Sequence, residues 1–297
     1  MVSGIIGTYL VGKGLLTQEQ LRDVMYEQKK TRAKLGLIAV AQGMLTSGQA
    51  DRVNRAQAKY DKRFGDLALE MGLLTTEQIE SLLGLQGDPY LSFAQTMEDM
   101  GLLNIAQLEQ CLLDLKDEMH FTNDDLDAIK RDDTDAILAL YLPREAGRFA
   151  ELCGVCLRTM IRFVDTDAYP LQGMIASRAE ADHAAVQQAE GAMLLNFGLS
   201  GKSGALLPLA RNFGKEDFAT VDGDALDAVA EFVNCVTGLY ASAISKRGVE
   251  LELLPPAFAA GLAGVQAEEM LVLPLVVGGR QINLMASIDT KINLKFK

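Results

Sequence analysis

The sequence predicts an α+β protein in which helix-turn-helix repeats precede a domain of antiparallel strands and helices. Two observations lead to this prediction: a pattern of period 29 in the first 118 residues, and short apolar stretches that alternate with turns after Pro143. Hydrophobic residues make up 49% and charged residues 23% of the 297, which is typical of a globular chain of about two domains. We expect a helical repeat domain over residues 1–118, a helical connector over 119–147 and a second domain over 148–297.

Four segments of the first domain align without gaps, and a glycine recurs in them every 29 residues, at Gly14, Gly43, Gly72 and Gly101. A left-handed residue at the end of a helix favours glycine. A capping box follows each glycine, as Thr17 with Gln20, Thr46 with Gln49, Thr75 with Gln78, and Asn104 with Gln107. Each unit is therefore predicted to be a short helix, a turn and a longer helix. Neighbouring units should stack, because one unit cannot bury its own apolar face.

The repeats also carry a partial motif: Arg-Leu-Gly, a glycine seven residues later, and a Leu-rich helix that ends in Gln. This pattern resembles the N-terminal module of type II secretion and MSHA-pilus ATPases (the MshE/GspE module), some of which bind cyclic di-GMP. The resemblance implies a nucleotide site at Lys34 and Gly36 in the second copy and at Arg63 and Gly65 in the third. The first copy has Ile5 in place of the arginine, and the fourth has Ser92 and Ala94. The alternative is that these glycines and leucines only form a helical stack.

The connector is predicted to form one or two helices with an acidic face, and to end at Pro143. The acidic residues are Asp124, Asp125, Asp127, Asp132, Asp133 and Asp135. A calcium loop needs a central glycine and a terminal glutamate that this segment lacks, so a solvated helix face is the better interpretation.

The second domain is predicted to hold a helix over residues 145–164 and a long central helix over 224–245. Strand-like apolar stretches cover 173–176, 192–199, 205–210, 251–254, 271–277 and 282–288. Gly278-Gly279 between two such stretches indicates a β-hairpin, and Gly201–Gly204 is interpreted as another hairpin turn.

The central helix has two faces. One face is apolar and should pack against the sheet: Leu226, Val229, Val233, Val236, Tyr240 and Ile244. Steps of three and four residues place a second, polar set together on the opposite face: Asp227, Glu231, Asn234, Gly238, Ser242 and Ser245. A glycine inside a helix costs about 1 kcal/mol relative to alanine, so Gly238 is expected where another molecule or backbone comes close.

This helix, followed by Pro255-Pro256, Gly261 and strands, resembles the CheC/CheX/FliY chemotaxis phosphatases, and in particular the one-site CheX-like branch. The resemblance covers about residues 148–297 and implies long antiparallel strands that carry helices. It also implies that Glu231 and Asn234 are catalytic and enter the active site of a phosphorylated response regulator, with Asp227 and Gly238 at the partner surface. The helix over 145–164 has no second Glu-x-x-Asn, and the stretch from Gly204 to Asp224 is shorter than in that family.

The residue types suit hydrolysis of an aspartyl phosphate, which needs little beyond a water placed in line with the leaving oxygen. The carboxamide of Asn234 can both donate and accept hydrogen bonds to hold such a water. Glu231 would grip a cation on the partner, since an exposed glutamate is a poor base. No cofactor of this chain is expected, and Mg²⁺ would be carried by the CheY-like receiver. The alternative hypothesis is a non-enzymatic, cyclic di-GMP-responsive adaptor; a homodimer is compatible with both.

Other classes are disfavoured. A net charge of −12 would repel nucleic acid, and the longest apolar run, Leu271–Val277, is far shorter than the ~20 residues of a membrane span. Four cysteines do not make a disulfide framework, and Cys153 and Cys156 fall inside a predicted helix, so a cytoplasmic location is expected. His120 and His183 have no matching ligand pair, so zinc is not expected.

Overall fold

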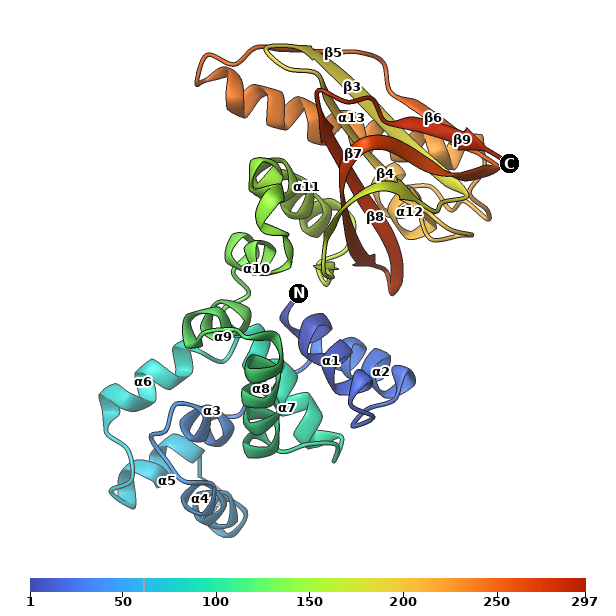
Figure 1. Cartoon of the computed structure of the whole chain (residues 1–297). Helices are drawn as coiled ribbons and strands as arrows, with labels where there is room; N and C mark the ends of the chain where they lie inside the picture. The colour runs from blue at the N-terminus through green and yellow to red at the C-terminus, as the bar shows by residue number, and fades with distance from the viewer. Residues whose placement is uncertain (61) are drawn as a thin grey trace. The chain divides into compact units, whose positions relative to one another are not determined.

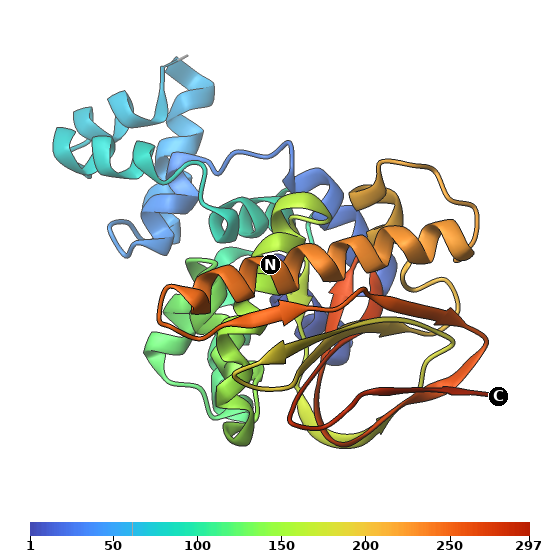
Figure 2. The same ribbon diagram turned by 90° about the horizontal axis from the view of Figure 1, so that it is seen from above.

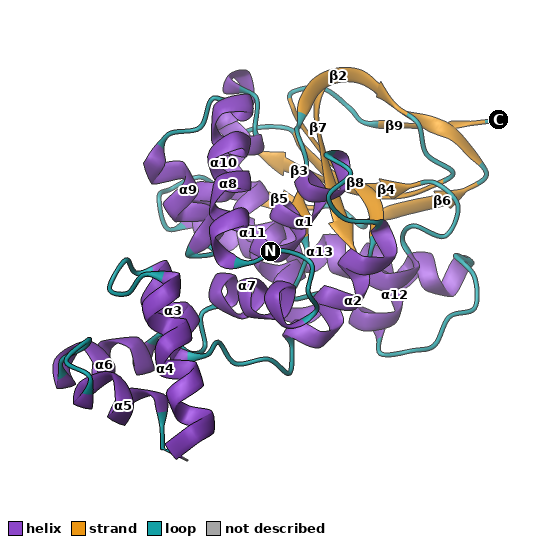
Figure 3. Cartoon of the chain, turned by 90° about the horizontal axis from the view of Figure 1, so that it is seen from below, coloured by secondary structure: helices purple, strands orange, loops and turns teal. Residues whose placement is uncertain are grey.

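The computed structural model describes residues 1–60 and 62–297, and the chain divides into two compact units (Figures 1 and 3). The helical unit comprises Val2–Asp133, and the sheet unit comprises Met1 and Thr134–Lys297. The division falls inside the predicted connector, after α9 (Asn123–Lys130) and before α10 (Thr134–Tyr141). The predicted α+β class, with an all-helical N-terminal part and a sheet-bearing C-terminal part, is confirmed.

Each repeat of the helical unit is a helix, a turn and a second helix. The elements of this unit before α9 are α1 (Val2–Gly12), α2 (Gln18–Gln28), α3 (Leu35–Ala41), α4 (Ser47–Tyr60), α5 (Phe64–Glu70), α6 (Thr76–Gly84), α7 (Pro89–Asp99) and α8 (Ile105–Met119). The second helix is the longer one in the last three repeats, whereas α1 and α2 have 11 residues each. The four recurring glycines all follow a short helix with φ between 66° and 70°. All four capping boxes are formed: each Gln amide oxygen accepts the N–H of its capping residue at 2.8 or 2.9 Å.

The repeats pack as two pairs within this unit. Helices α1 and α2 contact α7 of the fourth repeat, whereas α3 contacts α5 and α6 of the third. Within each pair, a glutamine side chain at the end of one repeat donates a hydrogen bond to a backbone carbonyl at the start of the other. Gln28 Nε2 donates to the carbonyl of Pro89 at 2.9 Å, and Gln86 Nε2 donates to the carbonyl of Ala33 at 3.2 Å. The first repeat therefore packs on the fourth and the second on the third, and α3 of the second repeat also contacts α7 and α8 of the fourth.

The sheet unit contains a curled antiparallel sheet and several helices. Its helices after α10 are η1 (Arg144–Phe149), α11 (Ala150–Phe163), α12 (Leu207–Gly214) and α13 (Gly223–Ser245). Its strands are β1 (Tyr169–Pro170), β2 (Met174–Ala179), β3 (His183–Gly191), β4 (Leu195–Gly201), β5 (Leu251–Leu253), β6 (Ala257–Ala260), β7 (Leu262–Val277), β8 (Arg280–Ile288) and β9 (Asn293–Phe296). The main order is β1-β7-β8-β4-β3-β5, with β2 and β9 paired to β7 and β6 paired to β3.

The hairpin predicted at Gly278-Gly279 is confirmed. Val277 pairs with Arg280, and the two glycines between them have φ of 55° and 70°, as a type I′ turn requires at both central positions. Two other predictions are wrong. Residues 205–210 are not a strand: Leu206 precedes α12 as its N-cap, and Leu209 and Ala210 are buried within that helix. Gly201–Gly204 is therefore a strand-to-helix turn and not a hairpin.

Helix α13 lies along one face of the sheet, where it contacts β3, β4, β5 and β6 (Figure 2). Its six predicted apolar residues are all buried. Phe232 is fully buried and meets the ring of Phe213 edge to face, with centroids 5.2 Å apart. Among the described helices α13 alone has the length and hydropathy of a membrane span, and 56% of its most apolar window is buried inside the protein. Packing of its apolar face thus fixes which residues α13 turns outward.

Candidate functional site

The outer face of α13 carries the polar residues predicted from the sequence. The helix starts at Asp222, whose carboxylate accepts the N–H of Ala225 at 3.0 Å, and then runs unbroken for 23 residues. Asp227, Glu231 and Asn234 are exposed, and Gly238 is half-buried. We call the set Asp227, Glu231, Asn234, Gly238, Ser242 and Ser245 the outer stripe. Because its carboxylates and its amide reach solvent, the outer stripe is available to a partner.

The side chain of Asn234 is tied to the sheet beneath it. Its Oδ1 accepts a hydrogen bond of 2.8 Å from Nε2 of Gln187, which lies on β3 and is buried. The same Nε2 donates to the backbone carbonyl of Leu254 at 2.9 Å. The side-chain oxygen of Asn234 is therefore bonded to the sheet, and its amide N–H groups can donate to other partners.

The fold gives no strong reason for glycine at position 238. A Cβ built there would have Leu253 Cδ2 at 3.9 Å as its nearest neighbour, which is an ordinary van der Waals contact. Glycine within a helix still costs about 1 kcal/mol relative to alanine. Space inside the domain therefore does not explain Gly238, and its position on the outer stripe fits the close approach of another molecule.

A shallow hollow of about 380 Å³ opens beside the N-terminal half of the outer stripe. Its lining includes the carboxylates Glu216, Asp224, Asp227 and Glu231. Like charges gathered around one hollow produce a negative potential that attracts cations and basic side chains. The described residues contain no group of three or more His, Cys, Asp or Glu arranged to hold a metal ion. The negative potential of the hollow is therefore suited to basic side chains.

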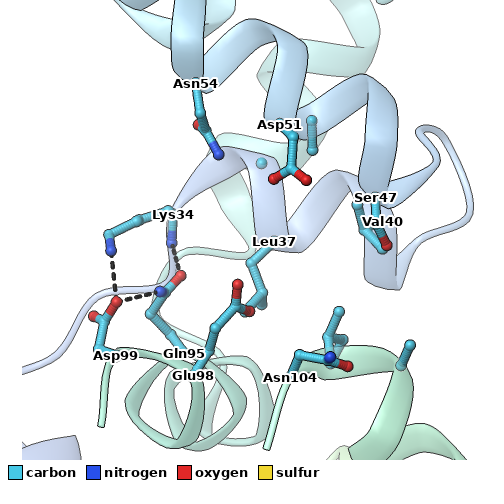
Figure 4. Close-up of a pocket in the computed structure, with 14 residues that line it drawn as sticks. Lys34, Leu37, Val40, Ser47, Asp51, Asn54, Gln95, Glu98, Asp99 and Asn104 are labelled. Carbon is cyan, nitrogen blue, oxygen red and sulfur yellow. Dashed lines mark hydrogen bonds and ion pairs between the residues drawn. The ribbon is translucent and has the colours of Figure 1, made fainter. Parts of the chain in front are cut away.

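The residues predicted to bind a nucleotide lie in the helical unit, and half of them share one pocket. Lys34 and Gly36 line a pocket of about 300 Å³ together with Asp51, Glu98 and Asp99 (Figure 4). Lys34 Nζ is paired with Asp99 at 2.6 Å. Although Glu98 is exposed, partial desolvation raises its pKa, and the neighbouring Asp99 raises it further. The Lys34 pocket thus has three carboxylates against one ammonium group.

The two glycines of the motif have packing roles. A Cβ on Gly36 would lie 3.0 Å from Cε2 of Phe64, and a Cβ on Gly65 would lie 3.2 Å from Cγ2 of Ile79. Arg63 caps α5 at an exposed position and is not among the residues that line the Lys34 pocket. Of the two cations of the motif, Lys34 lines this pocket and Arg63 does not. Close packing between helices accounts for both glycines of the motif.

The remaining sequence candidates have structural explanations. Cys153 and Cys156 are buried within α11, and burial raises the pKa of Cys153 to about 12 and that of Cys156 as well. Buried thiols with raised pKa values are unreactive. Cys111 and Cys235 are half-buried. His120 ends α8 with a left-handed backbone at φ 55°, whereas His183 begins β3.

Comparison with known proteins bears on the sheet unit. Residues 183–275 match the family model for the chemotaxis phosphatase CheX. This segment resembles CheX. It extends from β3 through α13 to β7, so it contains both the outer stripe and Gln187. No curated protein matches the chain.

Solved structures with the same resemblance cover a little under half of this chain. The chemotaxis protein CheX of Vibrio vulnificus is 15% identical over 46% of this chain and 96% of its own, with a TM-score of 0.41. The CheX of Desulfovibrio desulfuricans is 15% identical over 47% and 97%, with a TM-score of 0.42. The CheX-CheY-BeF3-Mg²⁺ complex of Borrelia burgdorferi is 14% identical over 46% and 95%, with a TM-score of 0.38.

Sequence reasoning missed Gln187 because it missed β3. The strand reads HAAVQQAEG, and alanine and glutamine have little preference for strands. Both faces of this strand are buried, Ala185, Gln187 and Ala189 on one and Ala184 and Val186 on the other, so β3 lacks the period-two alternation that indicates a strand. The hydrogen bonds of Gln187 are made with Asn234 and Leu254, which lie far away in the sequence, so no short motif predicts them.

Proposed function

We propose that the sheet unit is a phosphatase that hydrolyses the aspartyl phosphate of a CheY-like response regulator, with Glu231 and Asn234 as its catalytic residues. The observation that carries this proposal is the exposure of both side chains, one turn apart, on α13 within the segment that matches the CheX family model. The complex of the Borrelia burgdorferi CheX with CheY shows what that protein binds. Extending such a partner to this chain is part of the proposal.

The chemistry asked of Asn234 is positional. An acyl phosphate is already a reactive species, so its hydrolysis is accelerated mainly by a water held in line with the bond that breaks. The N–H groups of Asn234 point away from Gln187 and can donate to that water or to a phosphoryl oxygen. The second lone pair of Oδ1 can accept a hydrogen bond from the same water. Mg²⁺ belongs to the receiver in this proposal.

The role proposed for Glu231 is electrostatic. It lies beside Asp227 at the rim of the acidic hollow, which favours a basic side chain near the phosphorylated residue of the partner. Pairing Glu231 with such a cation would set the register of the complex and bring Asn234 to the phosphoryl group. Asp227 and Gly238 extend this contact along the helix.

The test is the rate at which receiver domains encoded in the same genome lose their phosphate, with and without this protein. Asn234→Ala should reduce the acceleration by about 100-fold or more, as expected when a positioned polar group is removed from a reacting centre. Binding to the beryllofluoride form of the receiver should persist. The matched control is Asn293→Ala, on exposed β9, which should leave the rate unchanged.

The helical unit is proposed to dock a partner or to sense a ligand for this phosphatase. If wild-type protein binds a receiver without accelerating the loss of phosphate from any of them, the phosphatase proposal is wrong. The non-enzymatic adaptor would then account for the fold.

A further inference from the structure

Gln187 lies where the edge of the sheet is interrupted. On either side of the interruption β3 pairs with β5 and β6, through Ala189 with Leu253 and Val186 with Ala257. Between these pairs stand Pro255 and Pro256, which have no N–H to donate to the ladder. The carbonyl of Leu254 instead receives its hydrogen bond from Nε2 of the Gln187 side chain.

The carbonyl of Leu254 determines which way both amides face. A carbonyl can only accept, so Gln187 must present its nitrogen to it, at 2.9 Å. That nitrogen also lies 2.8 Å from Asn234, which must therefore present its oxygen. The Asn234 amide is thus oriented by a chain of two contacts, with Oδ1 toward the sheet and Nδ2 toward solvent. The orientation does not depend on Asn234 itself.

The burial of the Gln187 amide lowers the stability of the fold. It is 1% exposed, and its Oε1 is buried without a hydrogen-bond partner among the described residues. A buried polar atom without a partner destabilises a protein, and an apolar side chain of the same size would have no such atom. The hydrogen bond that this amide donates to Asn234 gives a functional reason for burying it.

We propose that Gln187 is a positioning residue for the hydrolysis, an inference that rests on the proposed function. It turns the Asn234 amide so that Nδ2 is held ready to donate to the in-line water or to a phosphoryl oxygen. Fixing one hydrogen bond at Oδ1 also removes the freedom of Asn234 to rotate away. Gln187 touches neither the water nor the phosphate and acts only through Asn234.

The test is Gln187→Met, which keeps the length of the side chain and removes the amide. The kcat for dephosphorylation should fall by about 10- to 100-fold, the range expected when a catalytic group is misplaced by about an ångström. The KM should stay within about two-fold, because the outer stripe still meets the partner. Gln188→Met is the matched control on the same strand: the Gln188 side chain is bonded to Glu190 and should leave kcat unchanged.

A second readout separates positioning from general damage. The Asn234 side-chain amide resonances, assigned by their loss in Asn234→Ala, should report a rigid amide in wild type. They should report a mobile one in Gln187→Met and a rigid one in Gln188→Met. Should Gln187→Met fail to fold, Gln187→Leu provides the same test, because leucine is also apolar and has no N–H to donate.

The outcomes distinguish the inference from the proposed function. A fall in kcat together with a mobile Asn234 amide supports the positioning role. If Asn234→Ala abolishes activity while the Gln187 variants retain wild-type kcat, or if the Asn234 amide stays equally rigid in them, the positioning role is wrong and the phosphatase proposal stands. If Asn234→Ala itself keeps the wild-type rate, both are wrong.

Discussion

The outer stripe of α13 and the Lys34 pocket of the helical unit both carry charged residues that a short sequence motif singles out, and they differ in what surrounds those residues. On α13 the packing of one helical face leaves Glu231 and Asn234 exposed, and the carboxylates nearby share the sign of Glu231. In the Lys34 pocket the motif cation is paired with Asp99 and outnumbered by carboxylates. Glu231 therefore lies among like charges on an exposed helical face, whereas Lys34 lies in an exposed ion pair with Asp99.

The neighbours of a motif decide what it can bind. A stripe on one helix is fixed by the helical period, so its members stay together wherever the helix packs. A pocket built from several repeats depends on what each repeat contributes. Here the second repeat supplies Lys34, whereas Glu98 and Asp99 come from the fourth.

The largest contrast should come from reversing one charge in each region. Glu231→Lys would place a cation where we propose that a basic group of the receiver docks. Because like charges at an interface cost several kcal/mol, the KM for the phosphorylated receiver should rise by about 100-fold. Asp99→Lys makes the same change in the Lys34 pocket and should leave the KM within about two-fold. Steady-state dephosphorylation at low salt measures both.

Equal effects of the two reversals would contradict this contrast. They would mean that the total charge of −12, rather than the outer stripe, governs the encounter with the receiver. Raising the ionic strength gives a related check, because a docking surface of exposed charges is screened by salt.

A second contrast concerns two glycines within helices. Gly36→Ala would bring a Cβ to 3.0 Å from the buried ring of Phe64, so the free energy of unfolding of the helical unit should fall by about 1–2 kcal/mol. Gly238→Ala meets nothing closer than 3.9 Å and should raise the free energy of unfolding of the sheet unit by up to about 1 kcal/mol. Hydrogen exchange in increasing urea reports each unit separately.

The two glycines should also differ in function. Gly238→Ala should weaken binding to the beryllofluoride form of the receiver even as it stabilises the domain, because a methyl group then stands on the outer stripe. Gly36→Ala should leave that binding unchanged. Stabilisation by Gly238→Ala with undiminished binding would remove Gly238 from the partner surface.

The features predicted correctly from the sequence are those fixed by local chemistry. The glycine turns and capping boxes of the repeats involve residues only a few positions apart, and the two faces of α13 follow from the helical period alone. The strand predicted at 205–210 was wrong because its apolar run fits a helix as well as a strand, and the choice depends on what it packs against.

The features that could not be predicted depend on distant partners. Gln187 acquires its role from Leu254 and Asn234, which lie 67 and 47 positions away along the chain. Lys34 forms an ion pair with Asp99, which lies 65 positions away along the chain. A motif depends on residue types at short spacing, so it predicts neither the hydrogen bond between Gln187 and Asn234 nor the ion pair between Lys34 and Asp99.

The smallest expected effect concerns cyclic di-GMP, whose binding by the helical unit stays a prediction from the resemblance to the ATPase module. Its two phosphates would meet Asp51, Glu98 and Asp99 in the Lys34 pocket, and anions are repelled from such a site. We therefore expect calorimetry with cyclic di-GMP to give no binding heat for wild type, and no change for Arg63→Ala. Heat that Arg63→Ala abolishes would show that the ligand binds at the third repeat, where Arg63 is exposed, and that the acidic pocket is irrelevant to it. Heat that appears only when Asp99→Asn frees Lys34 would instead show that the motif has kept its geometry, with the fourth repeat blocking it.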